Sequence, residues 1–181
     1  MTFAIDLTEE QHAIKAAIED ICAKYDDQYW LRTDESGQFP EAFVADIAAG
    51  GWLGVAMPER FGGAGLGLQE AALMMQTVAQ SGAGFSGASA IHLNIFGLMP
   101  IVKFGTEAQQ ARFLPPAMSG ADKACFAVPE PNSGLDTSSL ETRAEKTNTG
   151  FRIRGRKIWT TNAQRANKIL LIARTTPKDK V

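Results

Sequence analysis

The chain has 181 residues, of which 45% are hydrophobic and 21% charged, a composition typical of globular proteins and unlike that of disordered segments. Its 18 Lys and Arg residues nearly balance 20 Asp and Glu residues, so the net charge of -2 favours neither nucleic acid nor an anionic membrane as partner. Cys22, Cys125, His12 and His92 form no disulfide framework and no metal-binding motif. We find no signal peptide and no apolar run of the roughly 18 residues that a membrane span needs. We therefore expect a cytoplasmic protein without a metal site.

A capping box predicts the first helix. In "TEEQ", residues 8–11, the threonine hydroxyl and the glutamine side chain can satisfy free N–H groups of the first turn. The apolar residues that follow recur at helical spacing and give the helix one apolar face: Ile14, Ile18, Ile21, Cys22 and Tyr25.

More helices are predicted as far as about residue 120. One begins with Pro40 at its first position and ends at Gly50 and Gly51, with Phe43, Val44 and Ile47 pointing inward. Two buried helices, rich in small residues and methionine, are expected at about 69–80 and 88–103. A second capping box, "TEAQ" at 106–109, begins a helix that we expect "LPP" at 114–116 to end, because proline lacks an N–H.

Two features of this helical part are open to a second interpretation. The segment "FGGAGLGL", residues 61–68, does not match the GxGxxG spacing and no strand precedes it, so a flexible interhelical loop is favoured over a dinucleotide-binding loop. His92 lies on an apolar helix, where a hydrogen-bonded core histidine is more common than a proton-transfer group.

After Gly120 the hydrophobic pattern changes to a period of two, which is typical of strands. "KACFAV" (123–128) predicts a buried strand, "FRIR" (151–154) a strand after an Asn-Thr-Gly turn, and "KILLIART" (168–175) another strand. Three or four strands cannot easily close a sheet, so we expect a β domain whose remaining strands lie outside this sequence.

Two segments of the β part suggest a ligand site. In "CFAVPEPNSGLDTSS", residues 125–139, a strand runs into a rigid turn whose N–H groups could meet carbonyl or phosphate acceptors. A plain surface turn, with Glu130 and Asp136 solvated or capping it, is an equally good interpretation. In "KIWTTN", residues 157–162, Trp159 at a strand end offers an aromatic face, and a threonine hydroxyl can donate to a ring nitrogen. This pattern suits an isoalloxazine ring, although a core tryptophan with surface threonines is the more common arrangement.

In their order and spacing, the two segments resemble the acyl-CoA dehydrogenase family. That family has a helical domain, then a β domain with a (F/Y)xVTEPxxGSD turn and, about two dozen residues later, KxWITN; this chain has "FAVPEPNSGLD" and "KIWTTN". "MPERFGGAGLGLQE" and "KFGTEAQQARFLPPAMSG" resemble the family's helical part, so the resemblance covers essentially all of the chain. It implies an α+β fold: a helical-bundle domain over 1–120 and the first strands of an incomplete β-barrel or sandwich domain over 121–181, without the family's C-terminal helical domain.

The resemblance assigns FAD contacts to both segments. It implies that Trp159 packs on the flavin and that the Thr161 hydroxyl bonds flavin N5, the atom that receives hydride, where a donor would stabilise the arriving electron density. The other implied cofactor contacts are Phe126, Val128, Pro129, Leu135 and Thr160. Pro129 replaces the family's threonine and supplies neither a hydroxyl nor an N–H, so one expected hydrogen bond is absent or supplied elsewhere.

Leu135 departs from the family at the substrate side. It replaces a serine that contacts the pantetheine or thioester region of acyl-CoA. Ser133 or Ser138 could take over that contact, and a changed substrate is the alternative. Leu135 and Ser133 are therefore the expected substrate-binding residues.

The reaction that the resemblance implies is FAD-dependent α,β-desaturation of an acyl-CoA, with electrons passing to an electron-transferring flavoprotein and with a homotetramer or dimer as the assembly. The base is a glutamate expected beyond Val181, so we assign no catalytic residue within the chain, and Glu130 matches a structural glutamate of the turn. The chain alone is expected to be an inactive N-terminal fragment. The alternatives are an acyl-CoA oxidase, nitroalkane oxidase or flavin monooxygenase of the same fold, or a helical binding module without flavin.

Overall fold

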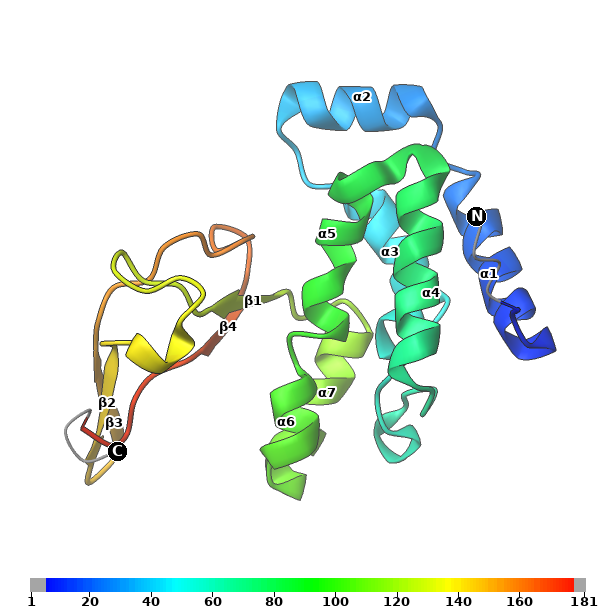
Figure 1. The fold of residues 1–181 in the computed structure, drawn as a ribbon. Coiled ribbons are helices and arrows are strands. Elements are labelled where there is room, and N and C mark those ends of the chain that lie inside the picture. Colours follow the sequence, from blue (N-terminus) through cyan, green and yellow to red (C-terminus); the bar gives the residue numbers. More distant parts are fainter. Residues whose placement is uncertain (1–5, 178–181) are drawn as a thin grey trace. The chain divides into compact units, whose positions relative to one another are not determined.

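The computed structural model describes residues 6–177, in two compact units that divide between Asp122 and Lys123 (Figure 1). The described part of the first unit is helical and that of the second contains all the strands. This is the α+β fold class that the sequence predicted.

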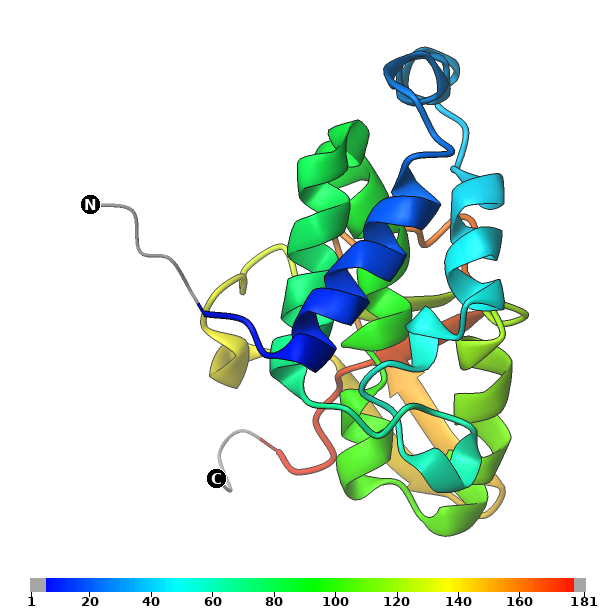
Figure 2. The same ribbon diagram turned by 90° about the vertical axis from the view of Figure 1, so that its right-hand side faces the viewer.

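Seven α-helices and three shorter helical segments make up the described part of the first unit. Helices α1, α3, α4 and α5 pack side by side around the core, as Figure 1 and Figure 2 show. That core includes the fully buried Phe43, Ile47, Leu53, Met74 and Ile91. The elements are α1 (Glu9–Cys22), α2 (Asp27–Ser36), α3 (Glu41–Ala49), η1 (Trp52–Gly54), η2 (Glu59–Phe61), α4 (Leu68–Val78), η3 (Ala79–Ala83), α5 (Gly84–Ile95), α6 (Met99–Phe104) and α7 (Glu107–Met118).

Both predicted capping boxes form. Thr8 and Gln11 exchange side-chain to backbone hydrogen bonds of 3.2 Å at the start of α1, and Thr106 and Gln109 do the same at the start of α7. The predicted inward face of α3 is buried, and the helix ends immediately before Gly50. These predictions are confirmed because each depends on residues that are close in sequence.

The sequence did not predict α2. Its sequence, "DQYWLRTDES", buries only Trp30, so it lacks the repeated apolar positions that reveal a helix. Local signals nevertheless fix its ends. The Asp26 carboxylate accepts from Tyr29 N at 2.8 Å, and Gly37 ends the helix with a left-handed φ of 62°.

Prolines affect two helices in ways that the sequence analysis did not predict: Pro100 lies where one expected helix is divided, and Pro115 and Pro116 lie inside α7 without ending it. The expected helix over 88–103 is divided into α5 and α6, because Pro100 has no N–H to bond the Phe96 carbonyl, which accepts from Met99 N instead. Ending α7 at residues 114–116 was wrong, since α7 continues to Met118. Burial of Ala117 and Met118 stabilises this last turn, and the carbonyl of Pro115 accepts from Ser119 N at 3.0 Å.

The glycine-rich segment is an interhelical loop, as predicted, and backbone hydrogen bonds hold it in place. Ala64 N donates to Gly54 O at 2.9 Å and Leu66 N donates to Val55 O at 3.0 Å. A Cβ on Gly63 would lie 2.2 Å from Met57 O, so the close approach of the two backbones requires glycine there.

The run Leu68–Phe104 is long and apolar enough, by length and composition alone, to cross a membrane. The prediction that no run qualifies was therefore wrong. In the structure the run is divided among α4, η3, α5 and α6, and Val78 and Ile91 are fully buried in the core. Because core helices satisfy the same criterion, the run alone is weak grounds for a membrane assignment.

Two separate strand pairs form in the described part of the second unit, residues 123–177. Strands β1 (Ala124–Ala127) and β4 (Lys168–Leu171) pair in parallel, whereas β2 (Arg143–Thr147) and β3 (Gly150–Arg154) form an antiparallel hairpin. A short 3-10 helix, η4 (Thr137–Ser139), precedes β2. The strands predicted in "KACFAV", "FRIR" and "KILLIART" are confirmed, and β1 is buried as expected.

Candidate functional site

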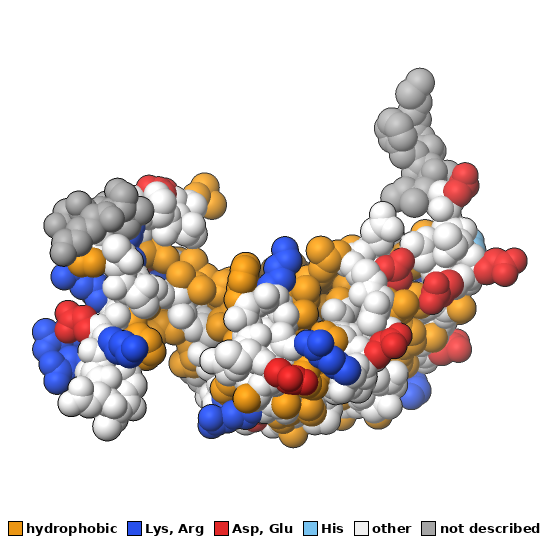
Figure 3. Space-filling model, turned by 90° about the horizontal axis from the view of Figure 1, so that it is seen from below, with side chains coloured by type: hydrophobic (Ala, Val, Ile, Leu, Met, Phe, Trp, Pro, Cys, Tyr) orange, Lys and Arg blue, Asp and Glu red, His pale blue; other side chains and the backbone are white. Residues whose placement is uncertain are grey.

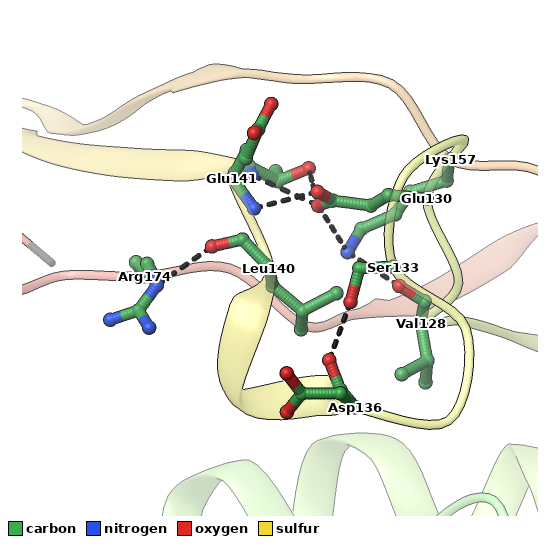
Figure 4. Close-up of polar contacts among 9 residues, drawn as sticks. Val128, Glu130, Ser133, Asp136, Leu140, Glu141, Lys157 and Arg174 are labelled. Atoms are coloured by element: carbon green, nitrogen blue, oxygen red, sulfur yellow. Dashed lines mark hydrogen bonds and ion pairs between the residues drawn. The ribbon is translucent and has the colours of Figure 1, made fainter.

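Glu130 is the centre of a buried polar network in the second unit (Figure 4). Its Oε1 accepts from Thr142 N at 2.9 Å and from Lys157 Nζ at 2.9 Å, and its Oε2 accepts from Glu141 N at 2.6 Å. The Thr142 hydroxyl also donates to Oε1. The carboxylate thus has four donors although only 5% of the residue is exposed.

These donors determine the charge of Glu130. Burial by itself would raise the pKa of the carboxyl, but the hydrogen bonds from Thr142, from the Glu141 backbone and from Lys157 outweigh burial and lower the pKa from 4.5 to about 2. Glu130 is therefore an ionised structural group. The interpretation of Glu130 as a solvated turn residue was wrong, whereas Asp136 does cap its turn by accepting from Ser138 N at 3.1 Å.

The two sequence segments singled out above meet at this network. Lys157 Nζ donates to Val128 O at 2.8 Å as well as to Glu130, and Ile158 N donates to Pro129 O at 3.0 Å. The start of "KIWTTN" is consequently fixed along the Pro-Glu-Pro turn, although 29 residues separate Val128 from Lys157. The Pro129 carbonyl accepts a hydrogen bond from within the protein, and the proline ring supplies no hydrogen-bond donor.

Trp159 does not lie at a strand end. Residues 155–160 form no regular structure, and Trp159 has a left-handed φ of 54° immediately after the residue bonded to Pro129. Its side chain is 85% exposed, so the interpretation as a core tryptophan was also wrong. Thr160 is half-buried and Thr161 is exposed at the start of the following turn.

The remaining predicted residues lie on or near the turn. Phe126 is half-buried in β1, and Leu135 is fully exposed. Ser133 is buried, and its hydroxyl donates to Asp136 O at 2.5 Å. The Ser138 hydroxyl donates to the Asp136 carboxylate. Both serines that could replace the family's serine therefore already have a partner inside the turn.

Sequence reasoning missed Lys157, Thr142 and Arg174 as residues that build the site. Arg174 Nε donates to Leu140 O at 2.7 Å, and Ala144 N donates to Arg174 O at 2.8 Å, so Arg174 holds the end of the turn against the segment after β4. The one sequence feature that could have led to these residues is Glu130, between two prolines. If this carboxylate is buried, it needs a cation and N–H donors nearby, and Lys157 and Thr142 supply them.

The exposed face of Trp159 and the hydroxyl beside it fit a planar ring with acceptors at its rim. Among residues 6–177, neither the Trp159 indole N–H nor the Thr161 hydroxyl has a hydrogen-bond partner, so both donors are open to a ligand. The residues present are thus compatible with a flavin.

Comparison with known proteins gives consistent results for both units. Residues 8–121 match the family described as "Acyl-CoA dehydrogenase, N-terminal domain", and residues 125–181 match "Acyl-CoA dehydrogenase, middle domain". A probable acyl-CoA dehydrogenase of Bacillus subtilis is 31% identical over 172 residues, covering 94% of this chain and 44% of that protein.

Solved structures share the fold. Butyryl-CoA dehydrogenase from Megasphaera elsdenii aligns with a TM-score of 0.83 and 25% identity, over 98% of this chain and 47% of that one. The FAD complex of PigA aligns with a TM-score of 0.88 at 22% identity, over 97% of this chain and 46% of that one. The chain therefore spans less than half the length of the proteins that it matches.

Proposed function

The chain belongs to the acyl-CoA dehydrogenase family, and from that membership we propose that it is part of an FAD-dependent enzyme that desaturates an acyl-CoA thioester. The observation that carries this proposal is the contact between the two segments. The hydrogen bonds of Lys157 and Ile158 to the Pro-Glu-Pro turn hold exposed Trp159 and Thr161 beside that turn. FAD, when bound, supplies the acceptor for a substrate hydride.

Each residue has a definite part in this proposal. Trp159 would pack on the flavin ring and exclude water from it, and the Thr161 hydroxyl would donate a hydrogen bond to flavin N5. Because Pro129 has neither an N–H nor a hydroxyl, it offers the ring an apolar contact and no hydrogen-bond donor. The other cofactor contacts are Phe126, Val128, Leu135 and Thr160, with Ser133 and Leu135 on the substrate side.

The base belongs to another part of the protein. Glu130 cannot serve, since a carboxyl with a pKa of about 2 is a weak base, and its buried oxygens already accept four hydrogen bonds from within the protein. We place a base glutamate beyond Val181, in keeping with relatives more than twice as long as this chain. An electron-transferring flavoprotein as acceptor, a homotetramer or dimer, and a cytoplasmic location belong to the same proposal.

The experiment is anaerobic mixing of the full-length protein with an acyl-CoA while the flavin absorbance is recorded. Bleaching of the flavin supports the dehydrogenase. A yellow protein that consumes oxygen with substrate would instead be an oxidase or monooxygenase of the same fold. A colourless protein that takes up no FAD would contradict the flavoenzyme proposal and favour a binding module.

A further inference from the structure

An arginine-lined cavity of about 540 Å³ lies within the second unit. Its walls are residues 130–132 of the turn, residues 141–143 at the start of β2, and residues 154–156 at the end of β3. Three of the lining side chains are cationic: Arg143, Arg154 and Arg156. We call this feature the arginine cavity.

Within the part of the chain that the structure describes, the cationic side chains of the arginine cavity lack anionic partners. Arg143 and Arg154 are directly opposite each other in the β2–β3 register, where like charges destabilise a hairpin. Among residues 6–177, none of the three arginine side chains forms an ion pair or a hydrogen bond. The nearby Lys157 and Arg174, by contrast, both donate to oxygens of the turn.

The charge of the region is unlike that of the rest of the chain. Residues 143–157 contain six Lys or Arg residues and one acidic residue, a formal excess of five positive charges, whereas the whole chain carries -2. Figure 3 shows Lys and Arg side chains on the surface of the second unit and also on that of the first. Glu130 lines the cavity but is neutralised by Lys157, which leaves Glu141 as the one acidic lining group without such a pair. The cavity is therefore positive overall.

The backbone brings the arginine-bearing segment close to the turn. A Cβ on Gly155, between Arg154 and Arg156, would lie 2.2 Å from the Thr142 hydroxyl oxygen, so only glycine allows this approach. Thr142 is itself held by Glu130. Arg154 and Arg156 thus flank a fixed contact point, Arg154 lies directly opposite Arg143 in the hairpin, and Asn132 also lines the cavity.

We propose that the arginine cavity is an anion site that binds the phosphate monoester of a small organic ligand. A guanidinium presents paired N–H donors that match two phosphate oxygens, and two or three converging guanidinium groups offset a dianion. A bound dianion would also relieve the repulsion between Arg143 and Arg154. The site does not depend on the flavin proposal, because no residue assigned to the flavin lines it.

The test is calorimetric titration of the full-length protein with adenosine 5′-monophosphate, with adenosine and with inorganic phosphate. We expect the monophosphate to bind, adenosine not to bind, and inorganic phosphate to bind more weakly. Affinity should fall as NaCl is raised, because the contacts are ionic. No binding of the monophosphate would overturn the proposal. Equal affinity for inorganic phosphate would overturn the claim that the ligand is an organic phosphate monoester.

Variants locate the site. Arg154→Gln should weaken binding of the monophosphate about 10-fold or more, as expected for lost hydrogen bonds to a charged group. Arg143→Lys keeps the charge but loses the paired donors, so a smaller loss is expected. Arg32→Gln, an exposed arginine of α2, is the matched control and should change nothing. Equal affinity in Arg154→Gln and Arg32→Gln would contradict the proposal, and flavin absorbance plays no part in either measurement.

Discussion

Lys157 Nζ lies 2.9 Å from Glu130 Oε1, and both side chains are less than 10% exposed. This ion pair joins the Pro-Glu-Pro turn to the segment that carries Trp159. Lys157 also donates to Val128 O, so one ammonium group holds two points of the turn. The position of Trp159 and Thr161 relative to that turn therefore depends on Lys157.

Lys157→Met should destabilise the second unit strongly. The methionine keeps most of the apolar stem but leaves the Glu130 carboxylate buried without its cation, at a cost of about 3–5 kcal/mol. Urea unfolding followed by amide exchange in β1 and β4 measures this loss. Lys15→Met is the matched control, because Lys15 pairs with Glu19 at the surface and such pairs contribute at most about 1 kcal/mol. A similar loss of unfolding free energy in the two variants would show that the buried ion pair stabilises the fold no more than a surface pair does.

The low pKa of Glu130 predicts a specific acid sensitivity. The folded-state pKa of about 2 is below the ordinary value of 4.5, so ionised Glu130 stabilises the fold above about pH 4.5, and this contribution is lost as the pH falls toward 2. Its size is on the order of 3 kcal/mol. Urea midpoints of the second unit between pH 6 and pH 2 should fall in the native chain and fall less in Glu130→Gln. An identical pH dependence in both proteins would assign the acid sensitivity to other groups.

One face of the β2–β3 hairpin should promote self-association of the isolated chain. Phe151 and Ile153 are on the same face of β3 and are 59% and 52% exposed. Replacing both by serine should lower the apparent mass of the 181-residue chain in light scattering at high concentration. Leu31→Ser, at an exposed position of α2, is the control and should have no effect. A native chain that is monomeric at every concentration would contradict this prediction.

Local signals made much of the fold predictable. The capping boxes at Thr8 and Thr106 and the glycines after α3 determine helix ends from a few adjacent residues. The missed helix α2 and the late end of α7 have a different cause. In α7, burial of Ala117 and Met118 outweighs two prolines, and that packing involves residues far away in the sequence.

The site was predictable as two segments but not as one arrangement. The parallel pairing of β1 with β4 joins residues 44 positions apart, Ala124 and Lys168, and nothing in the local sequence specifies it. The same is true of the Lys157 contacts. The left-handed φ of Trp159 was missed because Ile and Trp are common in strands, whereas Ile158 lies outside any strand and donates its N–H to the Pro129 carbonyl.

The central claim is that the Thr161 hydroxyl faces flavin N5, and single-turnover reduction of the flavin by an acyl-CoA in the full-length protein tests it most directly. Thr161→Val keeps the shape but removes a donor that matters most when N5 becomes electron-rich, so reduction should slow on the order of 100-fold while acyl-CoA affinity changes little. Thr161→Ser retains the hydroxyl and should remain close to the native rate. Native reduction rates in Thr161→Val, or equal slowing in Thr161→Ser, would contradict the placement of the flavin on this segment.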